Sequence, residues 1–253
     1  MRGGTAIEAL GLHLLPLPSY ALAIAIVLVA AMVQSNTGMG FGLVAAPLLA
    51  VIDVELVPVP VLLLGFVTAT MAAVRERPAI HWDEVGIGLF GRVSGAFLAA
   101  LVLYLLPDRH GFSLAFGLSI LVAVILSVAG VVLPLNRISL VTMGTVSGLT
   151  GTITSVGAPP MAIVYQNAAP GHARPTLSAF FSFGAMASFL VLAATGRVDL
   201  QDFVGVVLLA PAMYAGVRLA PYCRDWIDRR FRWIALALAT AAAIRLIVVG
   251  IVG

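Results

Sequence analysis

Two stretches of the sequence contain no charged side chain over a length greater than one membrane crossing. One runs from Glu8 to Asp53 and is interrupted only by His13, and the other runs from Arg137 to His172. A transmembrane helix needs about 20 apolar residues to cross about 30 Å of hydrocarbon. Each stretch is therefore too long for one regular span.

Six further apolar stretches have about the length of one transmembrane helix. They are residues 57–74, 85–106, 112–133, 176–195, 203–222 and 233–252. Hydrophobic residues make up 61% of the chain and charged residues 10%, against about 25% charged residues in soluble domains. The sequence therefore predicts an all-α polytopic membrane protein, with residues 1–253 in one membrane domain and eight hydrophobic segments that form eight to ten helices.

Small and polar residues interrupt both long stretches near their centres. The first interruption covers residues 34–42 and the second covers residues 150–160. Glycine is unfavourable inside helices and proline removes a backbone donor, so the freed backbone groups need partners at membrane depth. We expect two broken helical segments, which are either re-entrant hairpins or pairs of short spans.

The two interruptions align without gaps at a spacing of 113 residues, which pairs Thr37-Gly38 with Thr150-Gly151. This match predicts an internal duplication, with repeat 1 at residues 17–133 and repeat 2 at residues 138–252. If each broken segment crosses the bilayer an even number of times, each half crosses an odd number of times. The second half is then inverted relative to the first.

The arginines favour this inverted arrangement, because the chain contains no Lys and cytoplasmic loops are richer in basic residues. With both termini outside, eight Arg residues face the cytoplasm and three lie outside: Arg75, Arg77, Arg137, Arg174, Arg224, Arg229, Arg230 and Arg232 against Arg2, Arg109 and Arg197. If each long stretch crosses once instead, the same loops place five inside and six outside. Only the inverted arrangement satisfies the rule.

Paired broken helices in inverted repeats are typical of secondary transporters, whose binding site lies near the midplane between the repeats. A helix that begins at membrane depth presents unpaired N–H groups and the positive end of its dipole, and both favour an anion. The predicted anion site consists of Gln34, Asn36, Thr37, Gly38, Gly40, Gly42, Thr150, Gly151, Thr152, Thr154, Ser155 and Gly157. The alternative is that these residues only permit close helix packing.

Arg92 is a further candidate for the site, because it lies about 10 Å inside the predicted span 85–106 by helix rise. Gly88 and Gly95 share its helical face, which suggests that this face packs against neighbouring helices. Two interpretations stay open. Arg92 either lines the anion path or extends its side chain to the membrane interface.

The sequence gives no support for an enzyme, a metal centre, a cofactor or a nucleic-acid partner. It has no HExxH or CxxC motif, its scattered Arg residues form no basic stripe, and no Asp or Glu falls inside a predicted span. His13, His81 and His172 lie outside the predicted spans and His110 lies in a short loop. We interpret the histidines as interfacial residues.

The chain resembles the sulfite exporter TauE/SafE family over nearly its whole length, through the duplicated layout and the stretches 37–47 and 147–160. The resemblance implies a multi-pass transporter of the bacterial inner membrane that carries sulfite, sulfonates or related anions, often outward. Residues 152–155 occupy positions that are commonly Gly-rich in the family, so the particular anion stays open. A passive anion channel, a non-transporting scaffold or accessory protein, and a homodimer also stay open.

The predicted inversion can be tested with single cysteines in a Cys223→Ser background. Glu76→Cys lies in the loop predicted to be cytoplasmic, and Gln201→Cys lies in the equivalent loop predicted to be outside. An impermeant thiol reagent should therefore label the two variants from opposite sides of the membrane. Labelling of both from one side would contradict the inversion.

Overall fold

The computed structural model describes residues 16–105, 109–128 and 130–223, together with 237, 240–245 and 247–248. These residues form helices and connecting segments, with no strand among them. The α-helices are α2 (Leu17–Thr37), α3 (Phe41–Ile52), α4 (Val59–Arg75), α5 (Trp82–Leu105), α6 (Arg109–Val128), α7 (Arg137–Thr154), α8 (Ala158–Tyr165), α9 (Pro170–Ala194) and α10 (Leu200–Leu219). Three short 3-10 helices accompany them: η1 (Val54–Leu56), η2 (Arg77–Ala79) and η3 (Ala220–Cys223).

Five of the described helical segments are long and apolar enough to cross a bilayer. They are Leu17–Thr37, Val54–Arg75, Trp82–Leu105, Pro170–Ala194 and Leu200–Cys223. The apolar helices Phe41–Ile52 and Ser113–Val128 are shorter. The chain is thus an all-α polytopic membrane protein, as the sequence predicted. The predicted span 233–252 lies largely outside the described residues.

Two helices have different bounds from the predicted spans. Helix α9 begins at Pro170 rather than at residue 176, because proline in the first turn lacks only an N–H that would be unpaired there. His172 therefore lies in the first turn of α9 and not outside the helix. Helix α6 ends at Val128 rather than at residue 133, since Gly130 adopts a φ of 64° and Pro134 follows.

Both predicted interruptions are true helix breaks. Helix α2 ends at Thr37, where Gly38 adopts the left-handed conformation with φ 81°, and α3 begins after Gly40. Helix α7 ends at Thr154, where Ser155 adopts the same conformation with φ 64°, and α8 begins after Gly157. Each long apolar stretch is a helix, a three-residue break and a second, shorter helix.

The helix ends at the two breaks lie 117 residues apart, four more than the spacing of 113 at which the two stretches of sequence align. Thr154 lies 117 residues after Thr37, and both residues end a helix. Helix α7 continues through Thr150, whose hydroxyl donates to the carbonyl of Val146, four residues earlier. The duplication itself stays a prediction.

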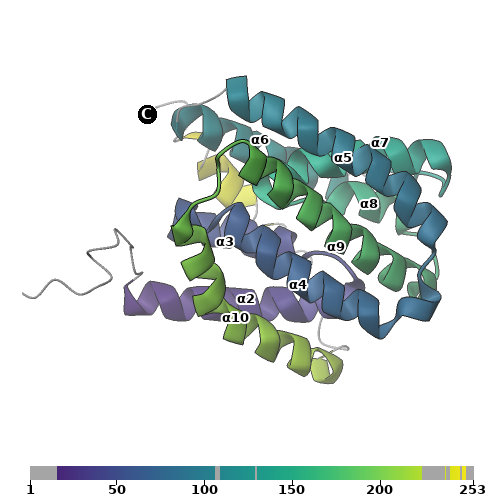
Figure 1. Cartoon of the computed structure of the whole chain (residues 1–253), viewed down its shortest axis with the longest axis horizontal. Coiled ribbons are helices and arrows are strands. Elements are labelled where there is room, and N and C mark those ends of the chain that lie inside the picture. The colour runs from purple at the N-terminus through teal and green to yellow at the C-terminus, as the bar shows by residue number, and fades with distance from the viewer. Residues whose placement is uncertain are drawn as a thin grey trace, which may run out of the picture.

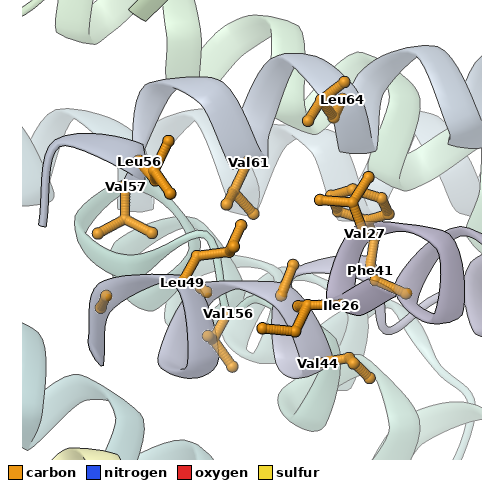
Figure 2. Packing of buried hydrophobic residues seen from close by; sticks show 14 of the residues in the cluster. Ile26, Val27, Phe41, Val44, Leu49, Leu56, Val57, Val61, Leu64 and Val156 are labelled. Atoms are coloured by element: carbon orange, nitrogen blue, oxygen red, sulfur yellow. The ribbon is translucent and has the colours of Figure 1, made fainter. Parts of the chain in front are cut away.

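The helices form a bundle in which α4 and α9 pack together between two outer groups (Figure 1). Helix α5 packs along α7 on one side, and α10 packs along α2 on the other. Figure 2 shows that apolar side chains from α2, α3 and α4 meet in a core that includes Ile26, Phe41 and Leu64. Val156 of the second break is buried in the same core. The second break is therefore anchored against the first half of the chain.

Helices α5 and α7 are in direct backbone contact. Four glycines lie at this contact: Gly91, Gly95, Gly144 and Gly148. A Cβ atom on any of them would overlap a backbone carbonyl oxygen of the other helix. Such small residues let transmembrane helices approach closely. Gly148 lies against the carbonyl group of Arg92, so this contact also fixes the backbone that carries the Arg92 side chain.

Hydrogen bonds and ion pairs show which helix ends lie together. Arg174 pairs with Glu76, which places the start of α9 beside the end of α4. Arg197 donates to the carbonyl oxygen of Leu103, which places Arg197 at the opposite end of α5.

The labelling experiment is better done at Ala79 than at Glu76. Glu76 is paired with Arg174, whereas Ala79 is exposed in the same connection between α4 and α5. The assignment of this end to the cytoplasm stays a prediction.

We expect Gly148→Ala to destabilise the protein, because its methyl group would overlap the Arg92 carbonyl. Overpacking of this kind typically reduces the free energy of unfolding by about 1–3 kcal/mol. Gly86→Ala is the matched control, since a Cβ at Gly86 meets nothing within 4 Å. Thermal melts in detergent should show a lower melting temperature for Gly148→Ala only. Equal melting temperatures would contradict the close contact.

Candidate functional site

The two breaks touch each other inside the bundle. Gly42, in the first turn of α3, lies so close to the second break that a Cβ atom there would overlap the carbonyl oxygen of Ser155. The hydroxyl of Ser155 donates to the carbonyl oxygen of Pro58, directly before α4, at 2.8 Å. Two segments far apart in the sequence therefore meet at one point.

A cavity of about 40 Å³ lies at this meeting point. Six of the predicted site residues line it: Gln34, Gly40, Gly42, Arg92, Ser155 and Gly157. One buried water needs roughly 10–15 Å³ measured in this way. The cavity can therefore hold a few waters or one compact ion.

Arg92 is buried, with an exposed fraction of 2%. Its Nη1 donates to the carbonyl oxygen of Ser147 at 2.8 Å and to the Ser147 hydroxyl at 2.6 Å. The guanidinium carbon also lies 5.6 Å and 5.5 Å from the ring centres of Phe180 and Phe181, within cation–π range. Arg92 does not extend to the membrane interface, so that interpretation of its side chain was wrong.

Three glycines make room for the guanidinium: Gly151, Gly157 and Gly184. A Cβ on Gly151 would lie 2.9 Å from both terminal nitrogens of Arg92. Ser147, which accepts from Arg92, donates its own hydroxyl to the carbonyl oxygen of Gly157 at 2.6 Å. Arg92 is thus built into the second break, although it belongs to α5.

The positive charge of Arg92 has no carboxylate partner within the described ranges, because the salt bridges there are His172–Glu84 and Arg174–Glu76. Its Nε also has no acceptor among those residues. Burying a charge without a partner costs several kcal/mol. A buried guanidinium that lines a cavity and lacks a counter-charge is suited to binding an anion.

Gln34 holds the first break together from both sides. Its Nε2 donates to the carbonyl oxygen of Gly38 at 3.1 Å, and its Oε1 accepts from the backbone N–H of Phe41 at 3.1 Å. The next two residues, Gly42 and Leu43, are in the first turn of α3, where N–H groups have no intrahelical acceptor. Both residues line the cavity. The first break therefore supplies backbone donors.

The second break has a different chemistry. Its helix α8 begins Ala158-Pro159-Pro160, and the two prolines have no N–H to donate. This helix end therefore presents few backbone donors, and the guanidinium of Arg92 lies beside it instead. The cavity combines N–H donors from one break with a positive charge at the other.

Four other predicted residues of the second interruption lie behind the cavity. The hydroxyl of Thr152 donates to Ser188 at 2.8 Å, and that of Thr154 donates to the carbonyl oxygen of Thr150 at 2.8 Å. Thr150 also donates within α7, and Gly151 packs against Arg92. These residues shape and support the second break rather than line the cavity.

The remaining predicted residues lie at the end of α2, away from the central cavity. Asn36 donates to the carbonyl oxygen of Ala220 at 2.9 Å, and Thr37 is exposed. Gly38 packs against the backbone of Arg174, where a Cβ atom would overlap the carbonyl oxygen. At this contact the close-packing interpretation describes what the glycine does.

Asn36 lines a second cavity, of about 220 Å³, near the ends of α2 and α4. Its walls are Ser35, Asn36, Ala72, Arg75, Glu76, Arg174, Ala220 and Pro221. Gln34 lines the central cavity and Ser35 the second one, so the last turn of α2 separates the two. The wall of the second cavity carries two arginines, Arg75 and Arg174, and one carboxylate, Glu76.

Sequence reasoning missed the apolar part of the central cavity. These lining residues are Phe41, Leu43, Val61, Leu62, Gly65, Ala158, Phe181 and Ala185. Gly65 gave a usable signal, as a lone glycine inside an apolar span. The others resemble ordinary helix-packing residues, and only the fold shows which of them face the site.

Comparison with known families places these features in context. The family model for the sulfite exporter TauE/SafE matches residues 23–246, a range that includes both breaks and Arg92. No curated protein and no solved structure matches the chain. Since the family model covers well over half of its length, the chain belongs to the sulfite exporter TauE/SafE family of membrane transporters.

Proposed function

We propose that this chain is a secondary transporter that binds a small sulfur-containing anion, such as sulfite or an organosulfonate, between the two helix breaks and exports it across the bacterial inner membrane. Membership of the sulfite exporter family supports the transport of an anion. The observation that carries the proposal is the buried Arg92 guanidinium, which lines the central cavity without a carboxylate partner.

The anion is held by two kinds of donor. Arg92 supplies charge and N–H groups in a fixed plane, a geometry that suits the oxygens of an oxyanion. The N–H groups of Gly42 and Leu43 and the helix dipole of α3 attract the same oxygens from the opposite break. These donors require no Lys side chain inside the membrane.

The size of the central cavity favours a compact ligand. Its volume of about 40 Å³ suits a sulfite ion or the headgroup of a sulfonate better than a whole extended organic anion. Apolar walls from Phe181 and Ala185 exclude water around the headgroup. Organosulfonates with a longer tail would need space outside this cavity.

The second cavity provides the approach to the site from the Arg75 end of the bundle. Arg75 and Arg174 in its wall attract an anion, and under the predicted topology this end faces the cytoplasm. Two contacts close the route from the second cavity to the central one. They are the backbone contact of Gly38 with Arg174 and the Arg174–Glu76 ion pair. Export therefore requires the start of α9 to move away from the end of α2.

A flux experiment separates a carrier from a passive channel and from a non-transporting scaffold. Proteoliposomes loaded with unlabelled sulfite should accumulate labelled sulfite against its gradient by exchange. A channel would only dissipate the gradient. A scaffold would give no flux above that of empty liposomes, and either result would contradict the proposal.

Arg92→Gln should reduce transport at least tenfold, because a hydrogen bond to a charged group contributes about 1.5–3 kcal/mol. Arg92→Lys keeps the charge without the planar donors, so it should retain part of the affinity. The measurements are sulfite flux against concentration and the melting temperature with and without sulfite. Wild-type affinity in a well-folded Arg92→Gln protein would contradict the assigned role.

Gly65→Ala should impair transport without destabilising the fold. The added methyl group would enter the wall of the central cavity, yet its nearest neighbour, a ring carbon of Phe41, would be at an ordinary contact distance of 3.4 Å. Gly86→Ala is again the matched control, since both changes raise helix propensity by about 0.5–1 kcal/mol. Unchanged flux and KM in Gly65→Ala would show that the cavity is not the substrate site.

A further inference from the structure

Three potential metal ligands come together at the Arg75 end of the bundle, outside the two cavities. They are His81, directly before α5, Glu84 in the first turn of α5, and His172 in the first turn of α9. One ligand atom from each lies within 4.8 Å of the other two. Because His172 is 88 residues from Glu84 in the chain, this cluster could not be recognised from the sequence.

The local backbone brings the imidazole rings of the two histidines together. The backbone N–H of His81 donates to the hydroxyl of Thr176 at 3.2 Å, one turn after His172 on α9. The two imidazole rings have centroids 3.8 Å apart at an interplanar angle of 31°. His81 and Glu84 are three residues apart, so both lie on the same side of the start of α5.

Glu84 is oriented by its neighbours in the way that a ligating carboxylate usually is. Nε2 of His172 lies 3.0 Å from Oε1 and 2.9 Å from Oε2. The hydroxyl of Tyr165, at the end of α8, donates to Oε2 at 2.8 Å. Hydrogen bonds to the outer side of a ligand carboxylate are a recurrent feature of metal sites.

We propose that His81, Glu84 and His172 bind one divalent transition-metal ion of the Zn²⁺ class, with water as a further ligand. Two histidines and one glutamate are an established zinc ligand set, with bonds of about 2.0–2.2 Å that place ligand atoms roughly 3.3–3.5 Å apart. The three ligand atoms lie up to 4.8 Å apart here, so metal binding requires the side chains to rotate and draw these atoms together. Imidazole donors favour such ions over Mg²⁺ and Ca²⁺, which prefer oxygen ligands.

The bound ion would clamp the start of α5 to the start of α9. Helix α5 carries Arg92, and α9 carries Phe181 and Ala185, so both helices contribute to the wall of the central cavity. The ion therefore slows any transport cycle in which the start of α9 moves. This consequence rests on the proposed transport function, whereas metal binding itself does not.

Binding is tested on the purified full-length protein after treatment with a chelator. Saturating Zn²⁺ should raise the melting temperature by about 5 °C or more, and elemental analysis should find one bound zinc per chain. The same concentration of Mg²⁺ should give no shift. Absence of a zinc-dependent shift in the wild type, or an equal shift with Mg²⁺, would overturn the site.

Variants assign the effect to these residues. His172→Gln and Glu84→Gln should lose the zinc-dependent shift, while Tyr165→Phe should weaken zinc binding roughly ten- to a hundredfold. Asp83→Asn is the matched control, because Asp83 is an exposed neighbouring carboxylate outside the cluster and should keep the full shift. The shift is read within each variant, so a change in basal stability does not affect the result. An equal shift in His172→Gln would overturn the assignment.

Flux measurements test the clamp separately. In proteoliposomes, saturating Zn²⁺ should slow sulfite exchange severalfold in the wild type but not in His172→Gln. Unchanged wild-type exchange with one zinc bound would overturn the clamp. Absence of sulfite transport both with and without zinc would count against the proposed function and not against the metal site.

Discussion

The surrounding structure depends on one constraint, which is that the Arg92 guanidinium is buried among transmembrane helices. A charge at this depth is expensive unless protein groups or a ligand replace its hydration. Gly151, Gly157 and Gly184 leave the space that the group occupies, and Ser147 accepts two of its hydrogen bonds. The glycine contact between α5 and α7 then fixes its backbone. A second break with a Cβ-bearing residue at position 157 could not have the same shape.

The same physical requirement is met differently at the two breaks. Backbone groups freed at membrane depth need a partner, since lipid offers none. At the first break one side chain, Gln34, satisfies a carbonyl on one helix and an N–H on the next. At the second, the Ser147 hydroxyl donates to the carbonyl of Gly157 and the Thr154 hydroxyl accepts from the N–H of Val156, and the prolines of α8 remove donors that would otherwise be unpaired. The site is consequently asymmetric, with a helix dipole on one side and a side-chain charge on the other.

The sequence was sufficient to predict the all-α membrane fold and both breaks, because stretch length and the position of Gly and Pro determine them. It was insufficient for the details that depend on packing. Thr150 and Gly151 resemble break residues, yet α7 continues through them to Thr154 and is packed there against Arg92 of α5. Whether Arg92 turned inward depended on glycines contributed by α7 and α9, and on the second break. The histidine–glutamate cluster depends on contacts between α5 and α9, which cannot be recognised from the sequence of either helix alone.

The start of α9 connects these features. Within one turn it carries His172, held by Glu84 in the first turn of α5, and Arg174, held by Glu76 at the end of α4, while the Arg174 backbone lies against Gly38. Ion pairs at partly exposed positions contribute little to stability and exchange readily with water. They can therefore hold α9 in place and still release it at small cost. Gly38, by contrast, brings the backbone of the first break directly against the backbone of α9. These ion pairs are thus specific in geometry and weak in energy, a combination that suits a contact which breaks and forms again in the proposed transport cycle.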